Sequence, residues 1–263
     1  MQTAALEALG LAGEWTYEAI EVAPDEFEAR VRGLPDEGFV GVNVTVPHKL
    51  AALAVAERAS PAARAIGAAN TLSFDHRGAF ADNTDAPGLV SALPEPPASR
   101  RALVLGAGGA GRACAWALRE AGAEVTVWNR TRSRAEELAA DLGISIWTPG
   151  TSDERRATGD FDLLVNATTV GMAEASAAPG SRTDAGTNLK ALPLDADALE
   201  ARHVVVDLVY GPATTPLIRI ARERGARVVD GVEVLVRQGA ASLRLWTGLD
   251  PPVDVMRAAA STT

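Results

Sequence analysis

A glycine-rich segment at residues 106–111 carries the residue types that most clearly indicate a chemistry. It follows the apolar run 102–105 and precedes a helical pattern. A strand, a glycine turn and a helix in this order bind the pyrophosphate of a dinucleotide. Gly106 allows the tight turn, Gly108 lets the backbone approach the pyrophosphate, and Gly111 lets the helix pack close to the strand. The N–H groups at the start of that helix would then face the phosphates.

The residues after the next strand-like run indicate which dinucleotide binds. Residues 124–128 read as a strand, and Asn129 follows them, with Arg130 and Arg134 close behind. NAD-binding proteins usually carry an acidic residue at this point, which holds the ribose 2′-hydroxyl. A guanidinium group instead suits a 2′-phosphate. The sequence therefore predicts NADP(H) as the cofactor, with the alternative that these arginines only form the solvated start of a helix.

Three polar stretches in the first third of the chain could carry a reaction. Thr45 and Lys49 come at and just after the end of a strand, where ligands bind in α/β proteins. Each residue also has a simple structural explanation. Asp85 could cap a helix, Lys49 could be solvated, and Asn70 and Thr45 could close turns. The stretches are residues 41–49, 67–71 and 82–88.

The elements that must position these residues alternate along the chain. In the first part we expect helices and strands, with a hairpin turn at 75–78 and a stiff proline-rich linker at 94–99. The expected helices are 1–9, 24–32, 49–59, one starting at Ser60-Pro61, and 87–93; the expected strands are 15–22, 39–46, 71–74 and 79–81.

From residue 101 onward, short apolar runs alternate with helical patterns, which is typical of a buried parallel sheet. The strands are expected at 102–105, 124–128, 162–166, 204–208 and 227–230; a flexible loop at 173–188; and helices at 232–246 and 253–260 that return to the first domain. The fold class is therefore α/β with two domains. The N-terminal α/β substrate domain covers 1–93, the linker 94–99, the C-terminal Rossmann-type NADP-binding domain 100–231, and the returning helices 232–263.

Composition excludes several classes of protein. The chain has 263 residues, enough for two modest domains, and its net charge of −9 argues against nucleic-acid binding. It has no signal-peptide pattern and no apolar run of membrane-spanning length, so we expect a cytoplasmic protein without a membrane partner. The three histidines lack metal-ligand spacing, so no metal is expected. Cys114, the single cysteine, is expected in the core. Monomer and homodimer both stay open.

Taken together, the three polar stretches resemble the shikimate dehydrogenase family. The family motifs NVTxPxK, GAxNT and DNTD stand at residues 43–49, 67–71 and 82–85. The resemblance covers nearly the whole chain in the family's order. Further matches are the glycine turn, Asn129–Thr131, Asn166–Thr168, Asp207–Tyr210 and Gly231–Gln238.

The resemblance implies an NADP-dependent reduction of 3-dehydroshikimate to shikimate, a small-molecule substrate of aromatic amino-acid biosynthesis. It assigns proton transfer to Lys49 and Asp85, because reducing a ketone needs a proton at oxygen as well as a hydride at carbon. It assigns substrate binding to Thr45, Asn70, Tyr210 and Gln238. It assigns cofactor binding to Gly106, Ala107, Gly108, Gly109, Ala110, Asn129, Arg130, Thr131, Arg134, Asn166, Ala167, Thr168, Leu208 and Gly231. Alternatively, Gln238 is a surface helix residue and Tyr210 caps a core.

The match departs from the family at the N-terminus. Family members begin with a strand and a Ser-x-Ser-Pro segment that holds the substrate carboxylate, and Met1 stands just after that position. We expect the first sheet to lack an interior strand, which exposes backbone groups on two neighbours. If the sequence is complete, we expect weak shikimate binding and reduced stability. A longer natural protein is the favoured explanation; a truncated product and a neighbouring chain that fills the gap are the others.

Two further functions compete with this interpretation. One is a quinate/shikimate dehydrogenase or a related cyclitol-acid dehydrogenase, which would often prefer NAD, and the arginines after Asn129 argue against it. The other is a non-catalytic NADP-binding sensor of metabolites. The presence of both Lys49 and Asp85 argues against a sensor, and the missing serines argue mildly for one. Turnover as opposed to simple binding separates the two.

Overall fold

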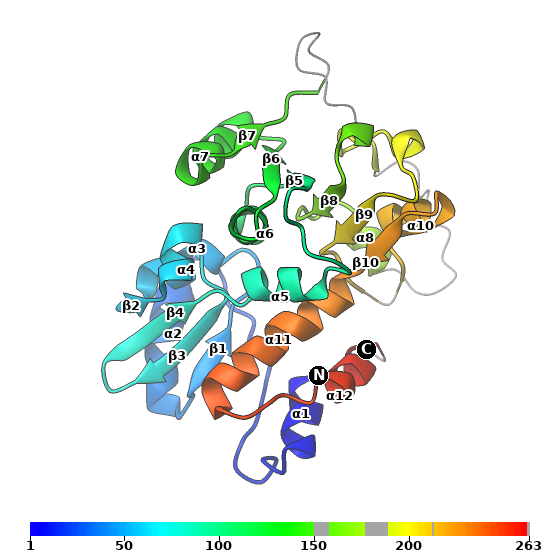
Figure 1. The fold of residues 1–263 in the computed structure, drawn as a ribbon. Coiled ribbons are helices and arrows are strands. Elements are labelled where there is room, and N and C mark those ends of the chain that lie inside the picture. The colour runs from blue at the N-terminus through cyan, green and yellow to red at the C-terminus, as the bar shows by residue number, and fades with distance from the viewer. Residues whose placement is uncertain (150–157, 177–188, 212, 262–263) are drawn as a thin grey trace.

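Two separate β-sheets organise the chain (Figure 1). The computed structural model describes residues 1–149, 158–176, 189–211 and 213–261. The first part of the chain forms a four-stranded sheet of order β1-β3-β4-β2, and the second a six-stranded sheet of order β10-β9-β8-β5-β6-β7. The predicted two-domain α/β fold with a Rossmann-type second sheet is therefore confirmed. The domain boundaries at residues 93, 99 and 231 stay a prediction.

The smaller sheet is mixed. β3 (Thr71–Asp75) pairs antiparallel with β1 (Gly41–Asn43) and β4 (Gly78–Asp82), and β2 (Arg58–Ala59) pairs parallel with β4. The predicted hairpin between β3 and β4 is confirmed. Buried side chains of two helices pack against this sheet and form its core. The helices and turns of this part are α1 (Gln2–Ala8), α2 (Phe27–Gly33), the 3-10 helix η1 (Leu34–Glu37), α3 (Lys49–Val55), α4 (Pro61–Ile66) and α5 (Asp85–Ala92).

Three predicted elements of this part were wrong in type or extent. Residues 15–22 form no strand: within the described residues β1 pairs only with β3, and no strand pairs with this segment. Of the strand expected at 39–46, only residues 41–43 form β1, because only these three residues pair with residues of β3. The helix expected to reach Ala59 ends at Val55, because Arg58 and Ala59 pair with β4.

All strand pairs of the larger sheet are parallel. Its five predicted strands are confirmed, and the short β7 was not foreseen. Successive strand residues face opposite layers: Val104 packs with α6 and α7, whereas Leu103 packs with α10. The elements are β5 (Arg101–Leu105), α6 (Gly109–Glu120), β6 (Glu124–Trp128), α7 (Arg132–Leu142), β7 (Ser145–Ile146), η2 (Thr158–Asp160), β8 (Leu163–Asn166), α8 (Met172–Ala175), η3 (Ala196–Ala198), β9 (Val204–Asp207), α10 (Pro216–Glu223) and β10 (Arg227–Val229).

The last two helices return to the first part of the chain, as predicted. α11 (Gly231–Thr247) leaves the larger sheet and packs on α5, β1 and β3 (Figure 1). α12 (Val253–Ala260) packs on α11 and on α1. The C-terminal helices therefore join the two halves of the molecule.

Two further expectations can be compared with the structure. Of the loop expected at 173–188, residues 173–175 belong to α8, and residues 177–188 lie outside the described residues. Cys114 is buried in the core, as expected, and burial raises the pKa of its thiol. Among the described residues, no helix combines the length and apolar character needed to cross a membrane.

Candidate active site

Lys49 and Asp85 form an ion pair at the starts of two helices. Lys49 is the first residue of α3 and Asp85 the first residue of α5. The Nζ atom of Lys49 lies 2.6 Å from Oδ2 of Asp85, and each side chain is only 12% exposed. Lys49 is therefore not a solvated lysine. The N-cap interpretation of Asp85 was wrong as well, because Thr84 occupies the N-cap position.

A buried amide holds the other oxygen of Asp85. Nδ2 of Asn70 lies 2.9 Å from Oδ1 of Asp85 and 3.1 Å from Oε1 of Gln238. Oδ1 of Asn70 accepts a hydrogen bond from the backbone N–H of Thr84 at 2.7 Å, which fixes the orientation of the amide. The carboxylate, the amide and the ammonium group thus form one connected cluster.

Gln238 reaches this cluster from far along the chain. It lies on α11, 168 residues after Asn70. α11 can approach α5 closely because position 88 is a glycine: a Cβ atom on Gly88 would lie 2.8 Å from Cβ of Gln238. The alternative that Gln238 is a surface helix residue was wrong.

Two of the predicted substrate-binding residues lie outside this hydrogen-bonded cluster. Thr45 is exposed and lines a cavity of about 310 Å³ between β1 and residues 20–22. Tyr210 is 49% exposed in the loop after β9, so the alternative that it caps a core was wrong. The structure therefore brings Asn70 and Gln238 to the Lys49–Asp85 pair, but not Thr45 and Tyr210.

The sequence did not point to Tyr17, which lies near Tyr210. The hydroxyl of Tyr17 donates to Oδ1 of Asn43 at 3.0 Å, and the hydroxyl of Ser242 on α11 lies 3.3 Å from the same oxygen. Burial raises the pKa of Tyr17, and the neighbouring Tyr210 raises it further. No local pattern could have revealed this contact, because its partners are far apart in the sequence.

The glycine turn has the close approaches that a dinucleotide site needs. Gly106 has a φ of +109°, and a Cβ atom there would lie 2.8 Å from the carbonyl oxygen of Ala167. A Cβ atom on Gly111 would lie 2.0 Å from the carbonyl oxygen of Gly106, so this position requires glycine. Gly108 is the N-cap of α6 and faces open space. The start of α6, with Ala110 in its first turn, is therefore accessible to a phosphate group.

The same turn touches the ion pair. A Cβ atom on Gly109 would lie 2.7 Å from Cβ of Lys49. The glycine turn of the larger sheet and the lysine of the smaller domain are thus direct neighbours, which places the predicted cofactor and substrate sites side by side.

Two arginines near the corner between β6 and α7 are available to bind an anion. Oδ1 of Asn129 accepts from the backbone N–H of Ala107 at 3.1 Å, and its Nδ2 donates to the carbonyl of Thr131, so Asn129 ties this corner to the glycine turn. Arg130 and Arg134 are exposed, and neither has an ion-pair partner within the described ranges. Their guanidinium groups are free to bind an anion.

The remaining predicted cofactor residues gather at the carboxyl ends of β8 and β9. Oδ1 of Asn166 accepts from the hydroxyl of Thr168 at 2.7 Å, and its Nδ2 donates to Asp207 at 2.8 Å. Burial raises the pKa of Asp207 to about 6, although hydrogen bonds from its neighbours oppose the rise. A Cβ atom on Gly231, the first residue of α11, would lie 2.8 Å from the carbonyl oxygen of Leu208.

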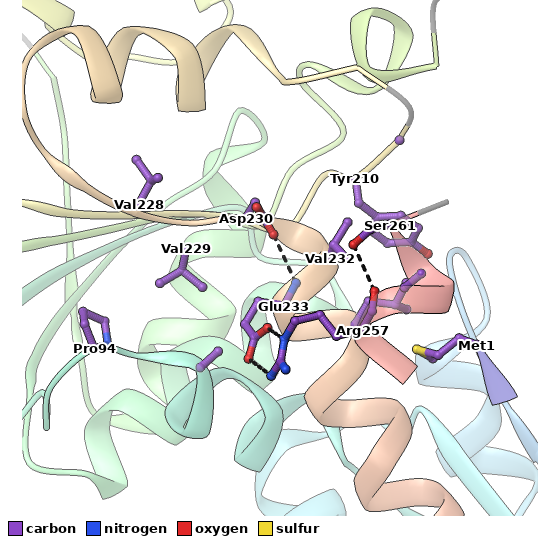
Figure 2. A pocket seen from close by; sticks show the side chains of 14 residues that line it. Met1, Pro94, Tyr210, Val228, Val229, Asp230, Val232, Glu233, Arg257 and Ser261 are labelled. Carbon is purple, nitrogen blue, oxygen red and sulfur yellow. Dashed lines mark hydrogen bonds and ion pairs between the residues drawn. The ribbon is translucent and has the colours of Figure 1, made fainter. Parts of the chain in front are cut away.

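A larger cavity of about 790 Å³ lies at the start of α11 (Figure 2). Tyr210 lines it, but no residue of the Lys49 cluster does. Two of its ionisable groups have partners: Glu233 accepts from Nε of Arg257 at 2.7 Å, and the side chain of Asp230 accepts from the backbone N–H of Glu233 (Figure 2). The hydrogen bond from Arg257 lowers the pKa of Glu233. These groups already have partners, and the residues predicted to carry the reaction lie outside this cavity.

Comparison with known proteins identifies relatives of this chain. A shikimate dehydrogenase (NADP(+)) of Thermus thermophilus is 45% identical over 262 residues, which are 99% of this chain and 91% of that protein. The chain belongs to the shikimate dehydrogenase family. A family protein of Halobacterium salinarum, also a shikimate dehydrogenase (NADP(+)), is 42% identical over 98% of this chain and 91% of its own length.

Sequence profiles of the family and a solved structure extend the match. Residues 1–72 match the shikimate dehydrogenase substrate binding domain, residues 91–173 shikimate/quinate 5-dehydrogenase, and residues 231–260 the shikimate 5′-dehydrogenase C-terminal domain. The crystal structure of a shikimate 5-dehydrogenase from Thermus thermophilus in complex with NADP(H) and shikimate has a TM-score of 0.82. It is 41% identical, and the match covers 99% of this chain and 92% of that one.

Proposed function

We propose that this protein is an NADP-dependent shikimate dehydrogenase, an oxidoreductase that interconverts 3-dehydroshikimate and shikimate. The observation that carries the proposal is the shielded Lys49–Asp85 pair in direct contact with the glycine turn at Gly109. Relatives that are 42–45% identical over nearly the whole chain have the same activity in their names. The solved relative holds both NADP(H) and shikimate.

The described residues fit NADP. Gly106 to Ala110 and the free start of α6 suit the pyrophosphate, and Arg130 and Arg134 suit a 2′-phosphate, because their guanidinium groups have no acidic partner in the described part of the chain. Asn129 and Thr131 shape this corner, and Asn166, Ala167, Thr168, Leu208 and Gly231 form the remaining edge of the site. When bound, NADP supplies or accepts the hydride.

Lys49 handles the proton in this proposal. During reduction, its ammonium group donates a proton to the carbonyl oxygen of the substrate; during oxidation, the amine takes the proton back from the hydroxyl group. Asp85 keeps Lys49 oriented through the 2.6 Å contact, and Asn70 keeps Asp85 oriented from its other oxygen. Because the pair is mostly shielded from water, its charges interact more strongly than they would at the surface.

In this proposal the substrate is held by two polar residues beside the pair and by two exposed residues outside the cluster. We assign its hydroxyl groups and carboxylate to Asn70, Gln238, Thr45 and Tyr210. Asn70 and Gln238 already belong to the cluster, and Tyr17 adds a second phenol near Tyr210. A non-catalytic sensor is not favoured, because a sensor needs no oriented proton-transfer pair.

The test is NADP-dependent oxidation of shikimate, followed by nicotinamide absorbance. Lys49→Ala is expected to lower kcat at least about 10²-fold while circular dichroism and NADPH binding stay unchanged. Leu50→Ala is the matched control, because Leu50 is the next residue of α3 and is 51% exposed. Quinate and NAD serve as alternative substrates. NADPH binding without turnover of shikimate in the unmutated protein would contradict the proposal.

A further inference from the structure

Asp207 is a buried carboxyl group that the proposed reaction does not use. It is the last residue of β9 and is 0% exposed. Its Oδ1 accepts from Nδ2 of Asn166 at 2.8 Å and from the backbone N–H of Val209 at 3.1 Å, and its Oδ2 accepts from the hydroxyl of Thr215 at 2.6 Å. Burial of a carboxylate is costly, so a site that supplies three donors is built to hold it.

One of these donors connects Asp207 to the loop after β8. Asn166 uses its Nδ2 to reach Asp207 and also the carbonyl of Val170. Its Oδ1 accepts from both the backbone N–H and the hydroxyl of Thr168. The conformation of residues 166–170 therefore depends on the orientation of the Asn166 amide, and Asp207 fixes that orientation.

The other two donors connect Asp207 to the loop after β9. Val209 lies between Leu208 and Tyr210, and its N–H group points to Asp207. Thr215 caps the N-terminus of α10 and also accepts from the N–H of Ile218. Asp207 thus holds the near end of this loop at Val209 and its far end at Thr215.

Both loops touch the elements on either side of them. Ala167 and Thr168 approach Gly106 of the glycine turn. The carbonyl groups of Leu208 and Val209 approach Gly231 at the start of α11. A shift of either loop would therefore be transmitted to the glycine turn or to the helix that carries Gln238.

We propose that Asp207 is a positioning residue for the cofactor: it holds residues 166–170 and 208–211 in the arrangement that forms this edge of the NADP site. This inference rests on the proposed function. Asp207 acts through Asn166, Val209 and Thr215, so its loss is expected to weaken cofactor binding without removing any group of the proton-transfer cluster.

The test compares Asp207→Ala with Val205→Ala. Val205 lies on the same strand, is fully buried on the side that α10 covers, and has an apolar side chain that makes no hydrogen bond, so its truncation destabilises β9 but leaves the network intact. NADPH dissociation constants would be measured by fluorescence without substrate, and amide hydrogen exchange without cofactor. Asp207→Ala is expected to weaken NADPH binding about tenfold or more and to raise exchange in both loops. Val205→Ala is expected to change neither.

Two milder variants keep the test decisive if Asp207→Ala does not fold. Asp207→Asn retains an acceptor for Asn166 and Val209 and is expected to restore most of the NADPH affinity. Thr215→Val removes only the donor to Oδ2 and is expected to raise exchange mainly at 208–211. The proposal is overturned if Asp207→Ala, or both milder variants in its place, bind NADPH and exchange like the unmutated protein. An equal loss of affinity in Val205→Ala overturns it as well.

The failure of the proposed function would be seen separately. A protein that binds NADPH but does not oxidise shikimate would contradict the dehydrogenase assignment, whereas the comparison of Asp207→Ala with Val205→Ala is decided by binding and exchange alone.

Discussion

At the scale of single residues, the Lys49–Asp85 pair depends on its neighbours for both shielding and orientation. Asn70 occupies the second oxygen of Asp85, and Gly109 leaves room for the lysine stem. Sub-ångström placement of a proton donor matters, because small displacements of reacting groups lower rates steeply. A residue that only makes space, such as Gly109, can therefore be tested in the same way as the residues proposed to transfer the proton.

Gly109→Ala is expected to displace the side chain of Lys49. The added Cβ atom would lie 2.7 Å from Cβ of Lys49, which is far inside van der Waals contact. We expect kcat at saturating NADP to fall about tenfold or more, with little change in the free energy of unfolding. Gly13→Ala is the control, because Gly13 lies outside the site and no protein atom lies within 4 Å of its added Cβ atom. Unchanged kcat in Gly109→Ala would contradict this prediction.

Asp207 makes the stability of the protein depend on pH. Burial raises its pKa from the ordinary 3.8 to about 6. A carboxyl group with a raised pKa contributes stability below its unfolded pKa, and that contribution is lost as pH rises through the folded pKa. From pH 4 to pH 7 we expect the unmutated protein to lose about 2 kcal/mol of unfolding free energy relative to Asp207→Asn. Urea unfolding at both pH values measures this difference, and a pH-independent difference would refute it.

At the scale of elements, the corner between β6 and α7 is the proposed determinant of the cofactor choice. Asn129 fixes the corner against the glycine turn; Arg130 lies in the corner, and Arg132 and Arg134 lie at the start of α7. Arg132 is already paired with Glu136 one turn further along, whereas Arg130 and Arg134 have no such partner among the described residues. The corner and the start of α7 therefore offer two arginines for a ligand and hold the third in an ion pair.

The double variant Arg130→Ala/Arg134→Ala is expected to lose its preference for NADP. Each guanidinium–phosphate contact contributes about 1–3 kcal/mol, so the KM for NADP should rise at least about tenfold while the KM for NAD stays nearly constant. Arg132→Ala is the matched control and should leave both values unchanged. Steady-state kinetics with each cofactor checks the prediction, and an equal rise of both KM values would contradict it.

At the scale of the whole molecule, a buried guanidinium group joins the two halves. Arg112 on α6 donates from Nε to the carbonyl of Ile66 at 2.7 Å and pairs with Asp141 on α7. Gly67, with a φ of +74°, makes room for it, because a Cβ atom there would lie 2.8 Å from the guanidinium group. One side chain thus links α4 of the substrate half to two helices of the cofactor half.

Arg112→Met is expected to destabilise the protein by about 2–4 kcal/mol, because it leaves the carbonyl of Ile66 and the carboxylate of Asp141 without their partner. Arg219→Met is the control: Arg219 and Glu223 form an exposed pair, and its loss should cost less than about 1 kcal/mol. Denaturant unfolding measures both. Equal effects of the two variants would show that Arg112 does not couple the halves.

Much of the larger domain could be predicted from local sequence. Its strands are apolar runs buried on both faces, and the glycine turn between β5 and α6 needs only its own residues. The three polar stretches likewise identified Lys49, Asp85 and Asn70. These features are local because a few neighbouring residues determine each turn, cap or buried run.

Only the tertiary structure decided which of these residues meet. Residues 15–22 have a strand-like pattern but form no strand, since a strand needs a neighbour for its hydrogen bonds. Gln238 reaches Asn70 across 168 residues because α11 packs on α5, and Tyr17 reaches Asn43 from a segment without regular structure. Local residue types therefore determined the chemistry available to the chain, and long-range packing determined which groups share a site, because contacts between distant segments leave no local pattern.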